Sequence, residues 1–287
     1  IPSPKIILRA FAAIKPRLIL SVPLIIEKIY KKQIKVTLQK TNVKILRNIP
    51  GIKNLIHRKI RQKLIDAFGG NFHEIIVGGA AFNEETTKFL HQIKFPFTVG
   101  YGMTECGPLI SYASWEENPP TAVGKVVDSL EIKINSENPQ TIPGEILVRG
   151  DNVMEAYYKN EEASKEAIDA DGWLHTGDLG LIDAQGYIYI KGRCKNMLLG
   201  PSGQNIYPEE IESRLNTFPY IQESLVLEQH GQIVARVYPD YDLADQKKVA
   251  EDELLKIFEG IRCALNKTLP AYSRVARIEV QPEEFEK

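Results

Sequence analysis

The chain has 287 residues, of which 43% are hydrophobic and 25% are charged, a composition typical of a globular protein with room for two domains. It contains no apolar run of the roughly eighteen residues that a membrane-spanning helix needs and no signal-peptide pattern. Its three cysteines are widely separated, which argues against a disulfide framework or a zinc site, so we expect a cytoplasmic protein.

The net charge of -1 conceals a basic segment at the start of the chain. Residues 1–63 carry sixteen Lys or Arg and a single acid, Glu27, interleaved with Ile and Leu. Lysines on solvent-exposed helix faces are the favoured interpretation. Peripheral contact of 1–63 with an anionic membrane, at its inner face, remains an alternative. No nucleic-acid-binding motif accompanies the charge, so nucleic acid is not an expected partner.

The first hundred residues alternate strands with helices, as parallel α/β sheets do. Apolar periodicity predicts strands at 17–22, 74–77 and 96–99, and helices at 24–35, 52–68 and 83–93. We therefore assign 1–109 to part of a large α/β subdomain built on a parallel sheet.

The rest of the chain divides into two regions with different patterns of predicted secondary structure. Short strand-like runs at 130–134, 145–149 and 187–191, separated by Pro and Gly turns, predict a small β-barrel-like subdomain over 110–192. Residues 193–287 predict a mobile α+β carboxy-terminal domain. Its expected elements are a helix capped near 208–210, strands near 223–228 and 232–237, a polar loop at 239–250 and a helix through 245–267.

A glycine-rich turn, Val-Gly-Tyr-Gly-Met-Thr-Glu at 99–105, directly follows the expected strand 96–99. Open α/β sheets bind ligands at the carboxyl ends of their strands. Tyr101 offers a flat face for a base, Thr104 can donate a hydrogen bond to a phosphate, and Glu105 supplies a hard oxygen for Mg²⁺. Taken alone, the segment is equally typical of a structural turn.

Two further segments carry side chains suited to a nucleotide. In Asp-Gly-Trp-Leu-His-Thr-Gly-Asp-Leu-Gly at 171–180, Asp178 could accept hydrogen bonds from both ribose hydroxyls, although an Asp beside Gly often caps a turn. His175 is expected to pack beside Trp173. In Lys-Gly-Arg-Cys-Lys-Asn at 191–196, Arg193 is a donor fork for ribose or phosphate oxygens, or else a surface salt bridge.

Together and in this order, the segments 101–105, 172–178 and 192–196 resemble the core motifs of the adenylate-forming superfamily of acyl-CoA synthetases, peptide-synthetase adenylation domains and luciferases. Gly-Gly-Ala-Ala at 78–81 is similar to that family's adenine-side loop. Residues 202–212 are most similar to bacterial long-chain fatty acid–CoA ligases. The resemblance implies ATP-dependent ligation of a long-chain fatty acid to coenzyme A through an acyl-adenylate, with Mg²⁺.

The resemblance also implies a role for each matching residue. The adenine would be enclosed by Gly79, Ala80, Tyr101 and Gly102, and the ribose would be held by Asp178 and Arg193. Thr104 would contact the α-phosphate, and Glu105 would hold Mg²⁺. Lys195 matches the hinge about which the terminal domain rotates between the two half-reactions, and Gly203 lies in the loop expected to contact coenzyme A.

Two parts of the family's machinery have no match in the sequence. A Ser/Thr/Gly-rich phosphate loop followed by Lys is not found, and the chain reaches Lys287 without the Pro-Lys-x-x-Ile-Lys-like segment that carries a catalytic lysine. We therefore expect a fragment of the enzyme, inactive by itself. The alternatives are an adenylation domain for another carboxylate, a non-catalytic nucleotide-binding or scaffolding relative, and a peripheral membrane module.

Overall fold

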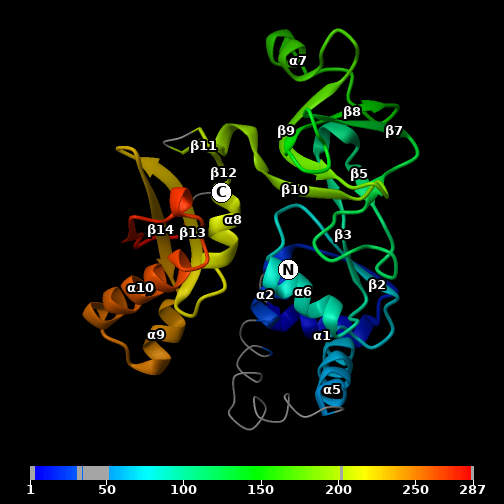
Figure 1. The fold of residues 1–287 in the computed structure, drawn as a ribbon. Helices are drawn as coiled ribbons and strands as arrows, with labels where there is room; N and C mark the ends of the chain where they lie inside the picture. The colour runs from blue at the N-terminus through cyan, green and yellow to red at the C-terminus, as the bar shows by residue number, and fades with distance from the viewer. Residues whose placement is uncertain (1–3, 31–33, 35–51, 201–202, 286–287) are drawn as a thin grey trace. The chain divides into compact units, whose positions relative to one another are not determined.

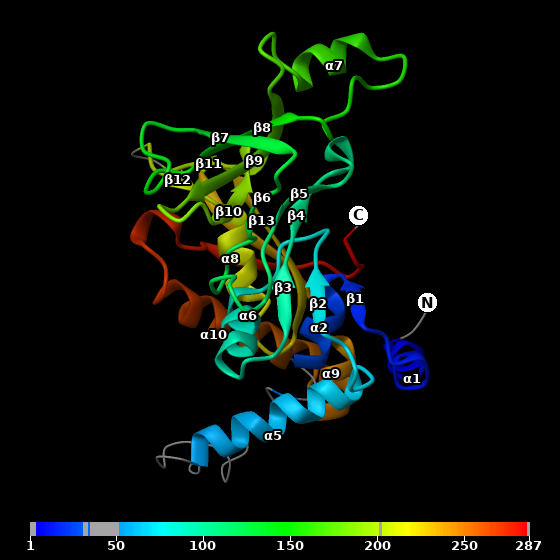
Figure 2. The same cartoon turned by 90° about the vertical axis from the view of Figure 1, so that its right-hand side faces the viewer.

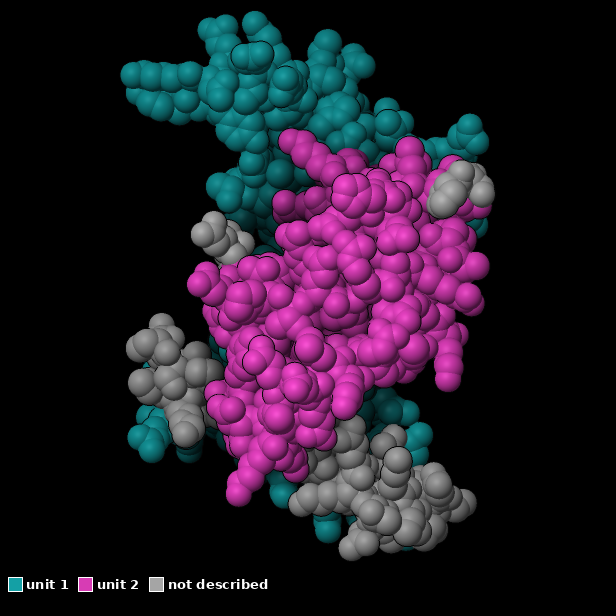
Figure 3. Space-filling model, turned by 90° about the vertical axis from the view of Figure 1, so that its left-hand side faces the viewer, with its two compact units in different colours: residues 1–176, 180–190 teal, residues 177–179, 191–287 magenta. Residues whose placement is uncertain are grey.

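The computed structural model of the protein describes residues 4–30, 34, 52–200 and 203–285. Contacts divide the chain into two compact units (Figure 3). Unit 1 comprises residues 1–176 and 180–190, and unit 2 comprises 177–179 and 191–287. Each unit has its own hydrophobic core. The division into three domains stays a prediction.

Unit 1 contains a three-stranded parallel sheet in the order β1-β2-β3 (Figure 2). Its strands are β1 (Leu18–Ser21), β2 (Glu74–Val77) and β3 (Phe97–Val99), and the helices around it are α1 (Pro4–Ile14), α2 (Pro23–Ile29), α5 (Ile52–Ala67) and α6 (Glu84–Gln92). The predicted α/β alternation is confirmed, with α1 as an unpredicted helix. The end of the helix expected at 24–35 falls largely outside the described residues.

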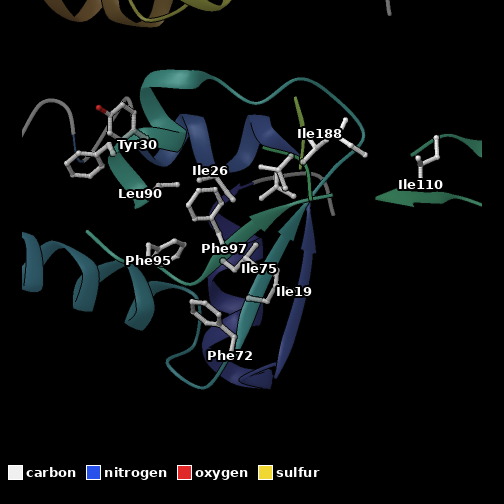
Figure 4. Close-up of a cluster of buried hydrophobic side chains, with 14 of the residues drawn as sticks. Ile19, Ile26, Tyr30, Phe72, Ile75, Leu90, Phe95, Phe97, Ile110 and Ile188 are labelled. Carbon is white, nitrogen blue, oxygen red and sulfur yellow. The ribbon is translucent and has the colours of Figure 1, made fainter. Parts of the chain in front are cut away.

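Burial of strand side chains holds this sheet to its helices. Ile75 and Phe97 are fully buried, and Ile19 is nearly so. Figure 4 shows Ile26 from α2 and Leu90 from α6 beside these strand residues. Because burial of one such side chain is worth about 1.5–3 kcal/mol, this cluster is a major source of the stability of unit 1. It fixes the strand ends from which the candidate loops emerge.

Residues 101–193, most of which belong to unit 1, are rich in β-structure (Figure 1). One sheet contains β4 (Tyr101–Gly102), β5 (Leu109–Tyr112) and β6 (Lys125–Val126), and a second has the order β10-β9-β8-β7. The second sheet contains β7 (Leu130–Asn135), β8 (Gly144–Gly150), β9 (Leu174–Ile182) and β10 (Ile188–Arg193), and α7 (Glu161–Ala167) lies between β8 and β9 in the chain. Both sheets are open within the described residues, so the barrel-like closure that we expected is not found.

Unit 2 is an α+β unit, as predicted. Its elements are β11 (Leu198–Leu199), β12 (Asn205–Ile206), α8 (Pro208–Leu215), β13 (Ile221–Gln229), β14 (Gln232–Pro239), α9 (Tyr241–Lys247), α10 (Glu251–Asn266) and β15 (Arg277–Val280). In the sheet β13-β14-β15, the first pair is antiparallel and the second parallel. The loop predicted at 239–250 is wrong, because Asp240 caps α9 by accepting a hydrogen bond from the Leu243 amide (3.1 Å).

The helix predicted over 245–267 begins later than expected, at Glu251. Lys248 adopts a left-handed conformation, with φ of 55°, which ends α9 and separates it from α10. No helix within the described ranges is long and apolar enough to cross a membrane. Membrane contact through 1–63 stays a prediction, since 31–33 and 35–51 lie outside the described residues.

Candidate functional site

The loops that follow the three parallel strands of unit 1 begin side by side. The Gly78 amide donates to the Ser21 carbonyl (3.1 Å), and the Gly100 amide donates to the Val77 carbonyl (2.9 Å). The loop 78–81 thus starts next to the loop 100–105, as the sequence predicts for a ligand site at the carboxyl edge of a sheet. Gly79 and Ala80 are exposed to solvent at this edge, and Gly79 has a φ of +83°.

The backbone at Gly102 approaches the following turn so closely that no side chain fits. A methyl group on its Cα would collide with the carbonyl oxygen of Pro108, a backbone atom that cannot move aside cheaply. Tyr101, just before it, is half-buried against the core of unit 1. The glycine in this motif is therefore required by packing, whatever the motif binds.

Thr104 and Glu105 lie in a 3₁₀ turn over Thr104–Cys106, where the Thr104 side chain is exposed and Glu105 is half-buried. The Tyr157 hydroxyl donates a hydrogen bond to Glu105 Oε1 (2.8 Å), and the Met154 amide donates to the Glu105 carbonyl (2.7 Å). This hydrogen bond to the carboxylate, together with burial, raises the pKa of Tyr157. Tyr157 thus orients the candidate Mg²⁺ ligand, and no sequence motif marks it.

Cys106 completes the turn but is not a nucleophile. It is fully buried, and burial, together with the nearby Glu105 charge, raises the pKa of its thiol to about 11. The thiolate is the reactive form of cysteine, so this side chain is inert near neutral pH.

Glu105 fits the role of a single protein ligand to Mg²⁺. Tyr157 engages Oε1, whereas Oε2 makes no hydrogen bond to any residue that the structure describes. The described residues include no cluster of three or more His, Cys, Asp or Glu side chains that could hold a metal by themselves. Mg²⁺ is commonly held by one or two carboxylates, with substrate phosphates and water completing its octahedron, and one half-buried carboxylate suits that arrangement.

Asp178 and Arg193 meet in unit 2. Asp178 lies in β9, Arg193 ends β10, and Arg193 Nε is 3.4 Å from Asp178 Oδ1. The Asp178 side chain is 16% exposed and that of Arg193 is 73% exposed. Asp178 is therefore a strand residue with a cationic partner. Because that partner is largely in solvent, the pair by itself contributes little to stability.

His175 makes polar contacts where we expected packing. Its Nδ1 is 2.9 Å from Glu145 Oε2, and its Nε2 is 3.8 Å from Asp169 Oδ2. The neighbouring Trp173 ring is covered by the Arg149 guanidinium, 4.6 Å from its centroid. His175 and Trp173, at the start of β9 and just before it, thus contact Glu145, Asp169 and Arg149. The sequence alone does not identify these partners.

The remaining predicted residues, Lys195 and Gly203, both lie in unit 2. Lys195 is exposed in a 3₁₀ turn over Cys194–Asn196, directly after β10. Gly203 is exposed between β11 and β12 with a φ of +80°, and apart from its chain neighbours no atom of the described residues lies within 4 Å of the position that a side chain would take. The structure thus brings together the loops 78–81 and 100–105 in unit 1, and Asp178 with Arg193 in unit 2. Convergence of all these groups on one nucleotide stays a prediction.

Comparison with known proteins assigns the chain to a family. The model of a family described as AMP-binding enzyme matches residues 1–158. The chain is 29% identical over 257 residues to a 4-coumarate–CoA ligase of Narcissus pseudonarcissus, covering 84% of this chain and 43% of the relative. It is 30% identical to the long-chain-fatty-acid–CoA ligase FadD15 of Mycobacterium bovis, covering 78% of this chain and 39% of that protein. It therefore spans less than half the length of these relatives.

Solved structures agree with this result. The o-succinylbenzoate coenzyme A synthetase of Bacillus subtilis in complex with ATP and magnesium is 26% identical, with a TM-score of 0.67, over 97% of this chain and 50% of that one. These relatives are, by name, ligases or synthetases that use coenzyme A, and the chain is similar to them over about half of their length or less. The chain belongs to the AMP-binding enzyme family.

Proposed function

We propose that this chain is part of an ATP-dependent ligase that joins a long-chain fatty acid to coenzyme A through an acyl-adenylate. The observation that carries the proposal is the pairing of Asp178 with Arg193 on adjacent strands, at the positions where the family resemblance expects the ribose contacts. A carboxylate beside a guanidinium can accept from ribose hydroxyls on one side and donate to ribose or phosphate oxygens on the other. ATP, Mg²⁺ and coenzyme A are the proposed co-substrates.

The reaction has two steps, and each step brings a different pair of reacting groups together at one site. The fatty acid carboxylate attacks the α-phosphorus of ATP and pyrophosphate leaves; the coenzyme A thiol then attacks the acyl carbon and AMP leaves. In the first step, Thr104 would donate to the α-phosphate and Glu105 would hold Mg²⁺ against the phosphoryl oxygens, where negative charge accumulates. Rotation about Lys195 would bring the loop of Gly203 to coenzyme A for the second step.

Ligases for an aromatic acid and for long-chain fatty acids are about equally similar to this chain. What favours the fatty acid is the segment 202–212, which is most similar to that of bacterial long-chain fatty acid–CoA ligases. Another carboxylate remains the competing assignment, and it shares every nucleotide-binding role proposed above.

Two measurements test the proposal. Titration of the 287-residue chain with AMP should show binding that Asp178→Ala weakens at least tenfold, since hydrogen bonds to charged groups are worth about 1.5–3 kcal/mol. A polypeptide of the relatives' length that contains this sequence should form palmitoyl-CoA from palmitate, ATP-Mg²⁺ and coenzyme A faster than 4-coumaroyl-CoA from 4-coumarate. The opposite preference would replace the substrate, whereas no AMP binding and no acyl-adenylate with any acid would remove the enzyme assignment.

A further inference from the structure

Two consecutive carboxylates at the start of α8 contact the end of β10 and the turn that follows it. Lys191 Nζ lies 3.1 Å from Glu210 Oε1. The Asn196 amide nitrogen Nδ2 donates to Glu209 Oε1 at 2.7 Å. All of these residues belong to unit 2, so the contacts are internal to one compact unit.

Gly192 provides the space in which the Glu209 carboxylate lies. Gly192 is buried, and a methyl group on its Cα would come within 2.6 Å of Glu209 Oε2. Glu209 therefore fills the position that a side chain at residue 192 would occupy. The segment 191–196 is held at three points: at Lys191 by an ion pair, at Gly192 by close packing and at Asn196 by a hydrogen bond.

These three points lie on both sides of Lys195 in the chain. Glu209 packs on Gly192, before Lys195, and accepts from Asn196, after it. A change of backbone torsion at Lys195 moves Asn196 relative to Gly192, so at least one of the two Glu209 contacts must break. We propose that Glu209 and Glu210 are positioning residues that form a clamp on 191–196 and hold Lys195 in this backbone conformation. Its relevance to catalysis rests on the proposed function, because it acts on the proposed hinge.

The closed arrangement of the clamp contains both favourable and unfavourable contacts, so its opening does not require a large free energy. Glu209 Oε2 is buried and has no hydrogen-bond partner among the described residues, a state that raises the free energy of the closed arrangement. Opening would return this oxygen to water and would break the hydrogen bond to Asn196. The half-exposed Lys191–Glu210 pair adds a modest, salt-dependent term in favour of the closed state.

Cys194 lies inside the clamped segment and serves as a probe of opening. It is a partly buried cysteine between Lys191 and Asn196 that forms no disulfide, whereas Cys263 is an exposed cysteine on α10 that also forms none. The rate of maleimide labelling at Cys194, divided by that at Cys263 in the same sample, measures access to the segment. Mass spectrometry of the two peptides gives this ratio for the full chain, without nucleotide.

The clamp predicts a specific pattern of labelling ratios. Asn196→Ala should raise the Cys194 ratio about tenfold, because it removes one charge-assisted hydrogen bond, and Glu209→Ala should raise it at least as much, because it also removes the packing on Gly192. The double variant should label no faster than Glu209→Ala alone. Lys191→Glu and Glu210→Lys should each raise it about two- to fivefold, and the combined charge swap should return it to within twofold of the wild type.

A matched control and a refuting result complete the test. Glu253→Gln, an exposed acid on α10, should leave the ratio unchanged. The clamp is refuted if Glu209→Ala and Asn196→Ala stay within twofold of the wild type, or if the charge swap labels as fast as its single variants. Because no nucleotide is present, failure here leaves the proposed ligase activity untouched, and loss of AMP binding in the test of that activity leaves the clamp untouched.

Discussion

Glu212 should make the stability of unit 2 depend on pH near neutrality. Burial, with the charges of Glu209 and Glu223 adding to it, raises the pKa of Glu212 to about 7, and the hydrogen bond from the Val226 amide (2.7 Å) opposes this rise only in part. The native state therefore retains the Glu212 proton at a pH where the unfolded chain, with a carboxyl of ordinary pKa 4.5, has lost it.

The sign and size of the effect follow from this difference. Since the native state binds more protons, stability is greatest below pH 4.5 and is lost as the pH rises through about 7. Each pKa unit is worth 1.36 kcal/mol, so the loss between pH 5 and pH 8 is about 2–3 kcal/mol. Glu212→Gln keeps an oxygen that can accept from the Val226 amide but cannot ionise. The variant should therefore be more stable than the wild type at pH 8 by about 2–3 kcal/mol and only slightly so at pH 5.

Urea unfolding at pH 5, 6, 7 and 8 measures this difference. Trp115 and Trp173 lie in unit 1, so unfolding of unit 2 should be followed by hydrogen exchange of peptides from β13 and β14. Other titrating groups contribute equally to the free energy of unfolding of the variant and the wild type, so their contributions cancel in the difference between the two. Glu253→Gln serves as an exposed control and should show no pH-dependent gain. Parallel stability–pH curves for the Glu212→Gln variant and the wild type would refute the reasoning.

Four other substitutions test the proposed hinge, the proposed Mg²⁺ ligand and the packing around two glycines. In a polypeptide of the relatives' length, Lys195→Pro should slow thioester formation more than adenylate formation, measured as separate half-reactions; equal loss in both would contradict the hinge role. In the same polypeptide, Glu105→Gln should weaken Mg²⁺ dependence of pyrophosphate release at least tenfold, and an unchanged Mg²⁺ titration would argue against a ligand role. Gly102→Ala should destabilise unit 1 by about 2–3 kcal/mol, measured by tryptophan fluorescence in urea, because its methyl group meets backbone. Gly260→Ala, in the middle of α10 with open space around it, should instead stabilise unit 2 by about 0.5–1 kcal/mol, measured by hydrogen exchange.

The elements that could be predicted from sequence are those that local rules determine. The strand at 74–77 is a short apolar run bounded by polar residues and glycine, and the structure has β2 at those residues. Asn83 precedes α6 and accepts a hydrogen bond from the Thr86 amide (3.0 Å), the capping contact typical of this residue. Both signals lie within a few residues of the element that they define.

β9 was missed because one of its glycines, Gly180, has a non-local cause. Gly177 and Gly180 interrupt the apolar pattern of 174–182 and are typical of a turn. In the structure, a side chain at Gly180 would come within 2.7 Å of Ile146 in the adjoining strand β8. The glycine is thus required by the approach of two strands far apart in sequence, which no pattern within 174–182 reveals.

The same limit applies to the candidate site, where sequence specifies the residue types but not their partners. Glu105 and Tyr157 are 52 positions apart, and only the folded chain shows that they share a hydrogen bond. Asp178 and Arg193 are different, because a local turn controls their meeting. The Asp183 carboxylate accepts from the amides of Gln185 and Tyr187, both at 2.9 Å, and this turn connects β9 to β10.

This turn sets the register of the two strands. A shift of one residue in the pairing would turn every side chain of one strand to the opposite face of the sheet, because successive side chains in a strand point to opposite faces. The contact between Asp178 Oδ1 and Arg193 Nε, on neighbouring strands joined by this turn, therefore depends on the register of the hairpin, and so does its proposed use as a ribose-binding pair.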